Sequence, residues 1–122
     1  MKSILYVEDD AINALVIKKL LKNVFEVTHV SDGEACMAIV SERAFDAILM
    51  DINLGKGKMD GVQTLHQLRG QVRAQPYIVI AVTSYALPED RERFLEEGFD
   101  EYMAKPVDRM ALIALLNQFI GE

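Results

Sequence analysis

Short apolar runs alternate with longer segments of helical period along the chain. Five runs predict strands, because they are mostly apolar or alternate between apolar and polar positions. They span residues 3–7, 25–30, 47–50, 78–82 and 101–104. The run from Ile78 to Val82 is apolar throughout, which is typical of a central strand in a parallel sheet.

The segments between these runs show helical spacing and capping signals. Helices are predicted from Ala11 to Lys22 and from Pro88 to Glu97. Three more are predicted to begin directly after Ser31, Asp60 and Asp108. Ser31 with Glu34, and Asp60 with Gln63, have the spacing of a capping box. Pro76 is expected to end the third helix and Gly98 the fourth.

Four of the predicted helices have apolar positions that we expect to face the sheet. In chain order these are Ile12, Leu15 and Val16; Ala35, Ala38 and Ile39; Val62, Leu65, Leu68 and Val72; and Leu112, Leu115, Leu116, Phe119 and Ile120. Strand and helix alternate strictly, which implies a parallel sheet with right-handed crossovers and helices on both faces. The predicted fold class is therefore α/β, with a doubly wound five-stranded parallel sheet.

Length and composition narrow the class of protein. A chain of 122 residues is close to the commonest domain size, so one domain over residues 1–122 is expected. About half of the residues are apolar, which excludes a disordered chain, and the single cysteine, Cys36, excludes an intramolecular disulfide. We expect Cys36 to be a small helix-packing residue.

Charge and the absence of long apolar stretches restrict the partners. The net charge of −6 argues against binding to nucleic acid. No segment resembles a signal peptide or reaches transmembrane length, so we expect a cytoplasmic protein that does not contact a membrane.

Polar residues that could bind a metal or take part in a reaction follow four of the predicted strands. The first strand ends in Glu8-Asp9-Asp10, the third in Asp51, the fourth in Thr83-Ser84 and the fifth in Lys105-Pro106. Ligands bind outside the carboxyl ends of the strands in such sheets, so these side chains should meet. Crowded carboxylates need positive charge nearby, which Lys105 and a hard divalent cation, best Mg²⁺, would supply.

This combination suits phosphoryl transfer, because an aspartate can attack phosphorus while Mg²⁺ and a lysine neutralise the transferring oxygens. Each residue also has a purely structural interpretation. Asp51 fits a turn or helix cap, Thr83 an ordinary strand residue and Tyr102 a fixed aromatic. The run 8–10 fits a solvated charge cluster, of which we assign only Asp10 to a helix cap.

Together these residues resemble the receiver domain of two-component response regulators over essentially the whole chain. The matching positions are Glu8-Asp9, Asp51, Thr83-Ser84, Tyr102 and Lys105-Pro106, in this order on five β/α units. The resemblance implies a flavodoxin-like (βα)5 fold with strand order 2-1-3-4-5. It also implies a cis peptide bond before Pro106.

The resemblance implies a role for each residue around the acceptor. Asp51 corresponds to the phospho-acceptor, and Lys105 to the lysine that pairs with acceptor and phosphate. Asp9 corresponds to a direct Mg²⁺ ligand, Glu8 to its partner acting through water, and Asn53 to a ligand through its backbone carbonyl.

Two further matches imply a switch. Thr83 corresponds to the hydroxyl that is drawn to the phosphate, and Tyr102 to the aromatic that swings inward in response. The resemblance also implies that the fourth helix, fifth strand and fifth helix form the face that contacts a downstream protein.

The chain departs from the family pattern at two places. Gly55 stands where a proline is usual, in a loop that looks about two residues longer than usual before Gly61, and Val107 stands where phenylalanine is common. We expect the loop at residues 55–58 to be mobile without phosphate and metal. Lys56 and Lys58 are either solvated or help to recruit the phosphodonor protein.

We therefore expect a stand-alone receiver, monomeric or weakly dimeric, that takes a phosphoryl group from a histidine kinase or phosphotransfer protein. It would not be a turnover enzyme. One alternative is a receiver module of a hybrid histidine kinase. Another is a small Mg²⁺-dependent aspartyl phosphatase, although such enzymes need a general acid where Asn53 stands. A phosphorylation-independent binding module is a third.

His29 and His66 lack a partner at metal-ligand spacing, so we expect surface or hydrogen-bonded histidines.

Overall fold

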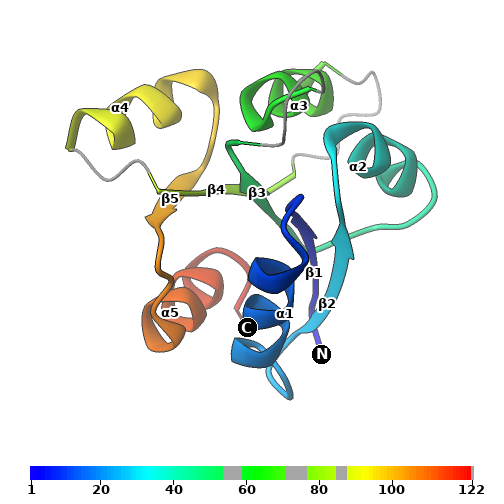
Figure 1. Cartoon of the computed structure of the whole chain (residues 1–122), viewed down its shortest axis with the longest axis vertical. Coiled ribbons are helices and arrows are strands. Elements are labelled where there is room, and N and C mark those ends of the chain that lie inside the picture. The colour runs from blue at the N-terminus through cyan, green and yellow to red at the C-terminus, as the bar shows by residue number, and fades with distance from the viewer. Residues whose placement is uncertain (54–58, 71–76, 85–87, 122) are drawn as a thin grey trace.

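Parallel strands form one sheet in the order β2-β1-β3-β4-β5 (Figure 1). The computed structural model describes residues 1–53, 59–70, 77–84 and 88–121. In this part of the chain the five strands are β1 (Ser3–Val7), β2 (Glu26–Val30), β3 (Ala47–Asp51), β4 (Val79–Thr83) and β5 (Glu101–Ala104). The fold class and the strand order expected from the sequence are both confirmed.

A helix follows each strand in the described part of the chain. The helices are α1 (Ala11–Leu20), α2 (Gly33–Val40), α3 (Gly61–Arg69), α4 (Pro88–Glu97) and α5 (Arg109–Ile120). Asp60 and Gln63 form the predicted capping box of α3, and Asp108 caps α5. Gly98 follows α4 with a φ of 116°, a left-handed conformation that glycine adopts without steric cost.

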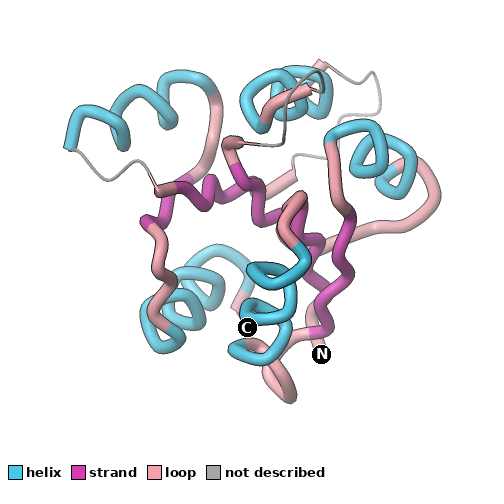
Figure 2. Tube along the Cα trace, in the orientation of Figure 1, coloured by secondary structure: helices cyan, strands magenta, loops and turns pink. Residues whose placement is uncertain are grey.

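The helices lie in two layers, with α2, α3 and α4 on one side of the sheet and α1 and α5 on the other (Figures 1 and 2). Alternate strand residues point to opposite faces. Thus Leu5 and Val7 belong to the core beneath α2, α3 and α4, whereas Ile4 and Tyr6 belong to the core beneath α1 and α5. Burial on both faces explains why the three inner strands, β1, β3 and β4, are apolar nearly throughout, whereas the edge strands β2 and β5 are less buried and contain polar residues.

The predicted inward face of α1 is wrong. Ile12 is 74% exposed, and Leu15 and Val16 are about half exposed, whereas Ala14 and Ile17 are buried. The expectation for α3 and α5 is correct over the described residues, since Leu65, Leu68, Leu112, Leu116 and Ile120 are buried. Val72 and Pro76 lie outside the described residues.

The start of α2 also differs from the expectation. Asp32, not Ser31, is the N-cap, and its carboxylate accepts from the backbone N–H of Ala35. Cys36 and Val40 are buried and Ala38 is exposed, so the expected inward position of Ala38 is wrong. Cys36 therefore packs in the core, as expected.

None of the helices in the described ranges is both long enough and apolar enough to cross a membrane.

Candidate functional site

The carboxyl ends of the strands bring the predicted site residues to one edge of the sheet. The register pairs Val7 of β1 with Met50 of β3, so Glu8 and Asp51 follow paired positions. Thr83 pairs with Ala104 of β5, and the backbone N–H of Lys105 donates to the Thr83 carbonyl at 2.7 Å. Residues that are far apart in the sequence therefore converge because the strands are parallel and in register.

Three carboxylates form the centre of this edge. Glu8, Asp9 and Asp51 each place an oxygen so that these atoms lie within 4.8 Å of one another. Nζ of Lys105 lies 3.5 Å from Oδ2 of Asp51 and 3.4 Å from Oε1 of Glu8. One ammonium cannot neutralise three carboxylates, and all the donors are hard oxygens, so the cluster fits a divalent cation such as Mg²⁺.

Glu8 is the most strongly perturbed of these carboxylates. It is only 1% exposed, and burial is the main reason that its pKa rises from 4.5 to about 7. The neighbouring Asp51 carboxylate raises the pKa further, while the hydrogen bond from Asn13 and the charge of Lys105 oppose the rise. Nδ2 of Asn13 donates to Oε1 of Glu8 at 2.8 Å.

Close backbone packing fixes Asp51 at the end of β3. The N–H of Gly61 donates to the carbonyl of Ile52 at 3.0 Å, which brings the first residue of α3 against the end of β3. A Cβ on Gly61 would lie 2.4 Å from the Asp51 carbonyl oxygen, so only glycine fits there. The N–H of Asn53 donates to Oδ1 of Asp51 at 3.3 Å.

Thr83 and Tyr102 lie beside the carboxylate cluster rather than in it. Thr83 is fully buried at the end of β4, on the face that also carries Val79 and Ala81. Tyr102 is half-buried in β5, with its ring centroid 6.2 Å from that of Phe94 in α4. Both residues thus connect the site edge to the core beneath α4.

Three further expectations concern the peptide bond before Pro106, the side chain of Val107 and the loop at residues 55–58. The peptide bond between Lys105 and Pro106 is cis, as the resemblance implied. Val107 packs against the core beneath α1 and α5. The loop at residues 55–58, with Lys56 and Lys58, lies outside the described residues.

Sequence reasoning missed two residues that touch Glu8. Asn13 binds its side chain, and the ring of His29 lies 2.6 Å from its backbone carbonyl. Asn13 lies in the first turn of α1, three residues after the Asp10 cap, and could have been noticed from that spacing. No signal in the sequence relates His29 of β2 to Glu8, which follows β1.

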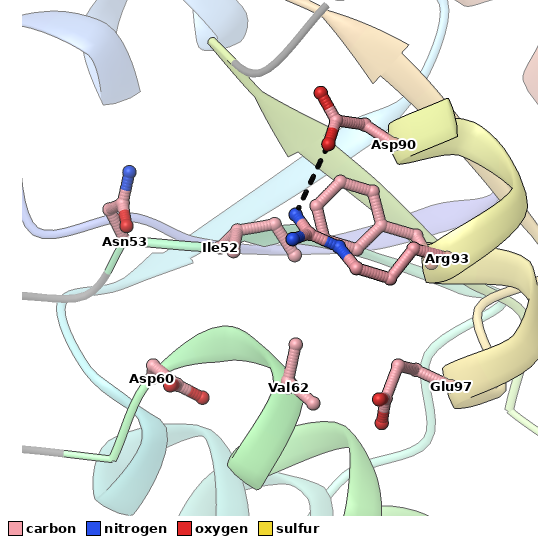
Figure 3. Close-up of a pocket in the computed structure, with 8 residues that line it drawn as sticks. Ile52, Asn53, Asp60, Val62, Asp90, Arg93 and Glu97 are labelled. Carbon is pink, nitrogen blue, oxygen red and sulfur yellow. Dashed lines mark ion pairs between the residues drawn. The ribbon is translucent and has the colours of Figure 1, made fainter. Parts of the chain in front are cut away.

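A hollow of about 660 Å³ opens beside the end of β3, between α3 and α4 (Figure 3). Ile52, Val62 and Phe94 form part of its lining, and Nη2 of Arg93 pairs with Oδ1 of Asp90 at 3.4 Å on the α4 side. The hollow separates the two helices that flank the end of β3.

The arrangement as a whole suits a nucleophilic carboxylate. Asp51 has an ammonium at ion-pair distance and two further carboxylates that can share a cation with it. An electrophile with anionic oxygens, such as a phosphoryl group, would be stabilised by the same positive charges.

Comparison with known proteins agrees with this geometry. The receiver domain of sensor histidine kinase PA1611 from Pseudomonas aeruginosa PAO1, solved with a magnesium ion coordinated in its active site cleft, is 36% identical, with a TM-score of 0.86. The match covers 99% of this chain and 98% of that domain.

The chain spans very different shares of two curated relatives. Sensor protein GacS of Pseudomonas syringae pv. syringae is 30% identical over 97% of this chain, but the chain spans only 13% of GacS. The polar-differentiation response regulator DivK of Brucella anthropi is 28% identical, and the match covers 99% of this chain and 98% of DivK.

A family model confirms the resemblance stated from the sequence. The model for the response regulator receiver domain matches residues 4–117, which include every residue of the carboxylate cluster and Lys105. With the five-stranded parallel sheet and the acidic edge described above, this match shows that the chain belongs to the response regulator receiver domain family.

Proposed function

We propose that this protein accepts a phosphoryl group on Asp51 in a Mg²⁺-dependent reaction and responds by changing its protein contacts. The observation that carries the proposal is the position of Lys105, whose Nζ lies 3.5 Å from Asp51 beside the cluster of three carboxylates. Such a pair of opposite charges within a metal-binding cluster is what acyl phosphate formation requires.

The reaction is a single displacement at phosphorus. An Oδ oxygen of Asp51 attacks phosphorus, and the bond from phosphorus to the donor's nitrogen or oxygen breaks, leaving its electron pair on the donor atom. Asp9 and Asp51 would ligate Mg²⁺ directly, Glu8 through water and Asn53 through its carbonyl. Bound Mg²⁺ would neutralise charge on the phosphoryl oxygens, while Lys105 pairs with the product.

The test uses a small donor. Acetyl phosphate with Mg²⁺ should add one phosphoryl group per chain, which intact mass spectrometry detects and hydroxylamine removes. Asp51→Asn should show no adduct, because an amide cannot form an acyl phosphate. An adduct that persists in Asp51→Asn, or that forms equally well in EDTA, would refute the proposal.

The proposed partners rest on the family match. We propose that the phosphodonor is a histidine kinase or a phosphotransfer protein, and that the chain works in the cytoplasm as a monomer or weak dimer. The downstream target binds the face formed by α4, β5 and α5. In support, Arg91 of α4 makes two 3.0 Å hydrogen bonds to Glu101 of β5, so a movement of α4 would alter that face.

The full-length match to DivK favours a stand-alone regulator of residues 1–122, while the match to GacS supports the alternative of a receiver within a hybrid kinase. A measurement of catalytic turnover would distinguish either kind of receiver from an aspartyl phosphatase. A receiver releases at most the one phosphoryl group it accepted, so p-nitrophenyl phosphate should not be hydrolysed over many cycles.

A further inference from the structure

The backbone of Glu8 lies just beyond the end of the β1–β2 pairing. The last paired residues of these strands are Val7 and Val30. The N–H of Glu8 continues the pattern by donating to the Val30 carbonyl at 3.0 Å. Among the described residues, no backbone N–H donates to the Glu8 carbonyl. Because Glu8 is buried, that carbonyl needs a partner from a side chain.

His29 supplies that partner. Its Nε2 lies 2.6 Å from the Glu8 carbonyl oxygen. A carbonyl can only accept, so Nε2 must carry a proton and donate, as it does both in the neutral Nε2–H tautomer and in the imidazolium. His29 is directly opposite Tyr6 in the register, with ring centroids 6.4 Å apart. The ring thus reaches two residues along β1, from Tyr6 to Glu8.

We propose that His29 is a positioning residue for the Mg²⁺ site. Strand β2 holds Glu8 through both of its backbone groups, by Val30 and by the His29 ring. The bonded carbonyl belongs to the peptide unit that joins Glu8 to Asp9, so the bond restrains the backbone from which both carboxylates project. His29 touches neither a carboxylate nor the acceptor in any described contact, and it acts through this peptide unit. The inference rests on the proposed Mg²⁺-dependent function.

The test compares two variants of similar length that differ in the donor. His29→Gln retains an N–H donor, and His29→Met does not. Mg²⁺ is titrated into the full chain by calorimetry. Loss of an outer partner of a metal site costs about 10–100-fold in affinity, so His29→Met should bind at least about tenfold more weakly, whereas His29→Gln should stay within about threefold of the wild type. His66→Met, at the other histidine, should not change the affinity.

Circular dichroism in EDTA establishes that the variants are folded, and His29→Asn, whose amide is too short to reach the carbonyl, replaces His29→Met if that variant unfolds. Equal Mg²⁺ affinities for the donor and non-donor variants would overturn the inference. A wild-type chain that does not bind Mg²⁺ would overturn the proposed function and this inference with it, so the two failures are distinguishable. Faster amide exchange at Asp9 in His29→Met without metal would be a second supporting result.

Discussion

Glu8 is the residue at which burial and charge are in greatest conflict. Its carboxylate is removed from solvent and lies beside Asp51, and both effects favour the protonated form. Asn13 and Lys105 compensate only in part. Such a conflict is common in sites that bind cations, because a bound cation relieves the repulsion and is therefore held more tightly.

This conflict predicts a pH dependence of stability without metal. The folded-state pKa of Glu8 is about 7, against 4.5 for the ordinary carboxyl group. Between these values the folded chain binds more protons than the unfolded chain, so the free energy of unfolding falls as pH rises from about 4.5 to 7. The Glu8 contribution is on the order of 3 kcal/mol. Urea unfolding in EDTA at several pH values should show this fall, and Glu8→Gln should reduce it. An identical slope in the two proteins would contradict the assignment.

Removing Asp9 should separate stability from metal binding. Asp9→Ala relieves repulsion from Glu8 and Asp51 but removes an expected direct ligand. It should keep or raise the unfolding temperature in EDTA, and weaken Mg²⁺ binding by more than the roughly tenfold cost of losing an outer partner. Asp10→Ala is the matched control. It removes the α1 cap, which should cost about 1 kcal/mol of stability, and should leave Mg²⁺ affinity unchanged. Unchanged Mg²⁺ titration in Asp9→Ala would contradict its role.

The charged residues at the centre of the site could be predicted from the sequence more fully than the neighbouring residues that hold them in place. Asp51 and Lys105 could be predicted because each directly follows an apolar strand, and parallel strands place such positions on one edge. Asn13 could have been noticed only as a neighbour of the Asp10 cap, and His29 could not be predicted, because both roles depend on hydrogen bonds across elements. Spacing along one chain does not specify which side chain will reach a carbonyl on the neighbouring strand.

At the scale of elements, α1 shows the limit of hydrophobic periodicity. Its apolar residues occupy two faces, one with Ile12, Leu15 and Val16 and one with Ala14 and Ile17. Either set has helical spacing, and the first contains more apolar surface. In the structure the second set is buried, in the core on the α1 and α5 side of the sheet.

The orientation of α1 predicts unequal effects of two matched substitutions. Ile17→Ala removes a buried side chain and should cost about 2–5 kcal/mol of unfolding free energy. Ile12→Ala removes an exposed one and should change stability by no more than about 0.5 kcal/mol. Urea unfolding at constant pH measures both. Similar losses for the two variants would mean that α1 is rotated from the orientation described.

At the scale of the molecule, strict alternation of strands and helices was enough to predict a parallel sheet covered on both faces. It did not determine which strands are neighbours. The order came from the family resemblance, which rests on residues such as Asp51 and Lys105 rather than on the hydrophobic pattern. The cores on the two sides of the sheet then follow from the alternation of side chains along each strand.

A switch between two packings of the whole molecule should depend on Thr83. If phosphate on Asp51 draws the buried Thr83 hydroxyl, Tyr102 can move toward the vacated space, and its contact with Phe94 of α4 changes. Acetyl phosphate should therefore shift the ring resonances of Tyr102 in the wild type. Thr83→Ala should still accept phosphate, but its Tyr102 resonances should not shift and its binding to the downstream protein should weaken. A full shift in the phosphorylated variant would exclude this coupling.

The ion pair between Lys105 and Glu8 joins residues that are 97 positions apart. Closing so long a loop costs chain entropy before any contact offsets it, so we expect this pair to form after the local contacts of the chain. During synthesis, Asp51 leaves the ribosome before Lys105, so the Asp51 carboxylate lacks its ammonium partner until β5 has been made and paired with β4. If Asp51 accepts a phosphoryl group as proposed, a nascent or partly unfolded chain would therefore lack the positive charge that pairs with the product.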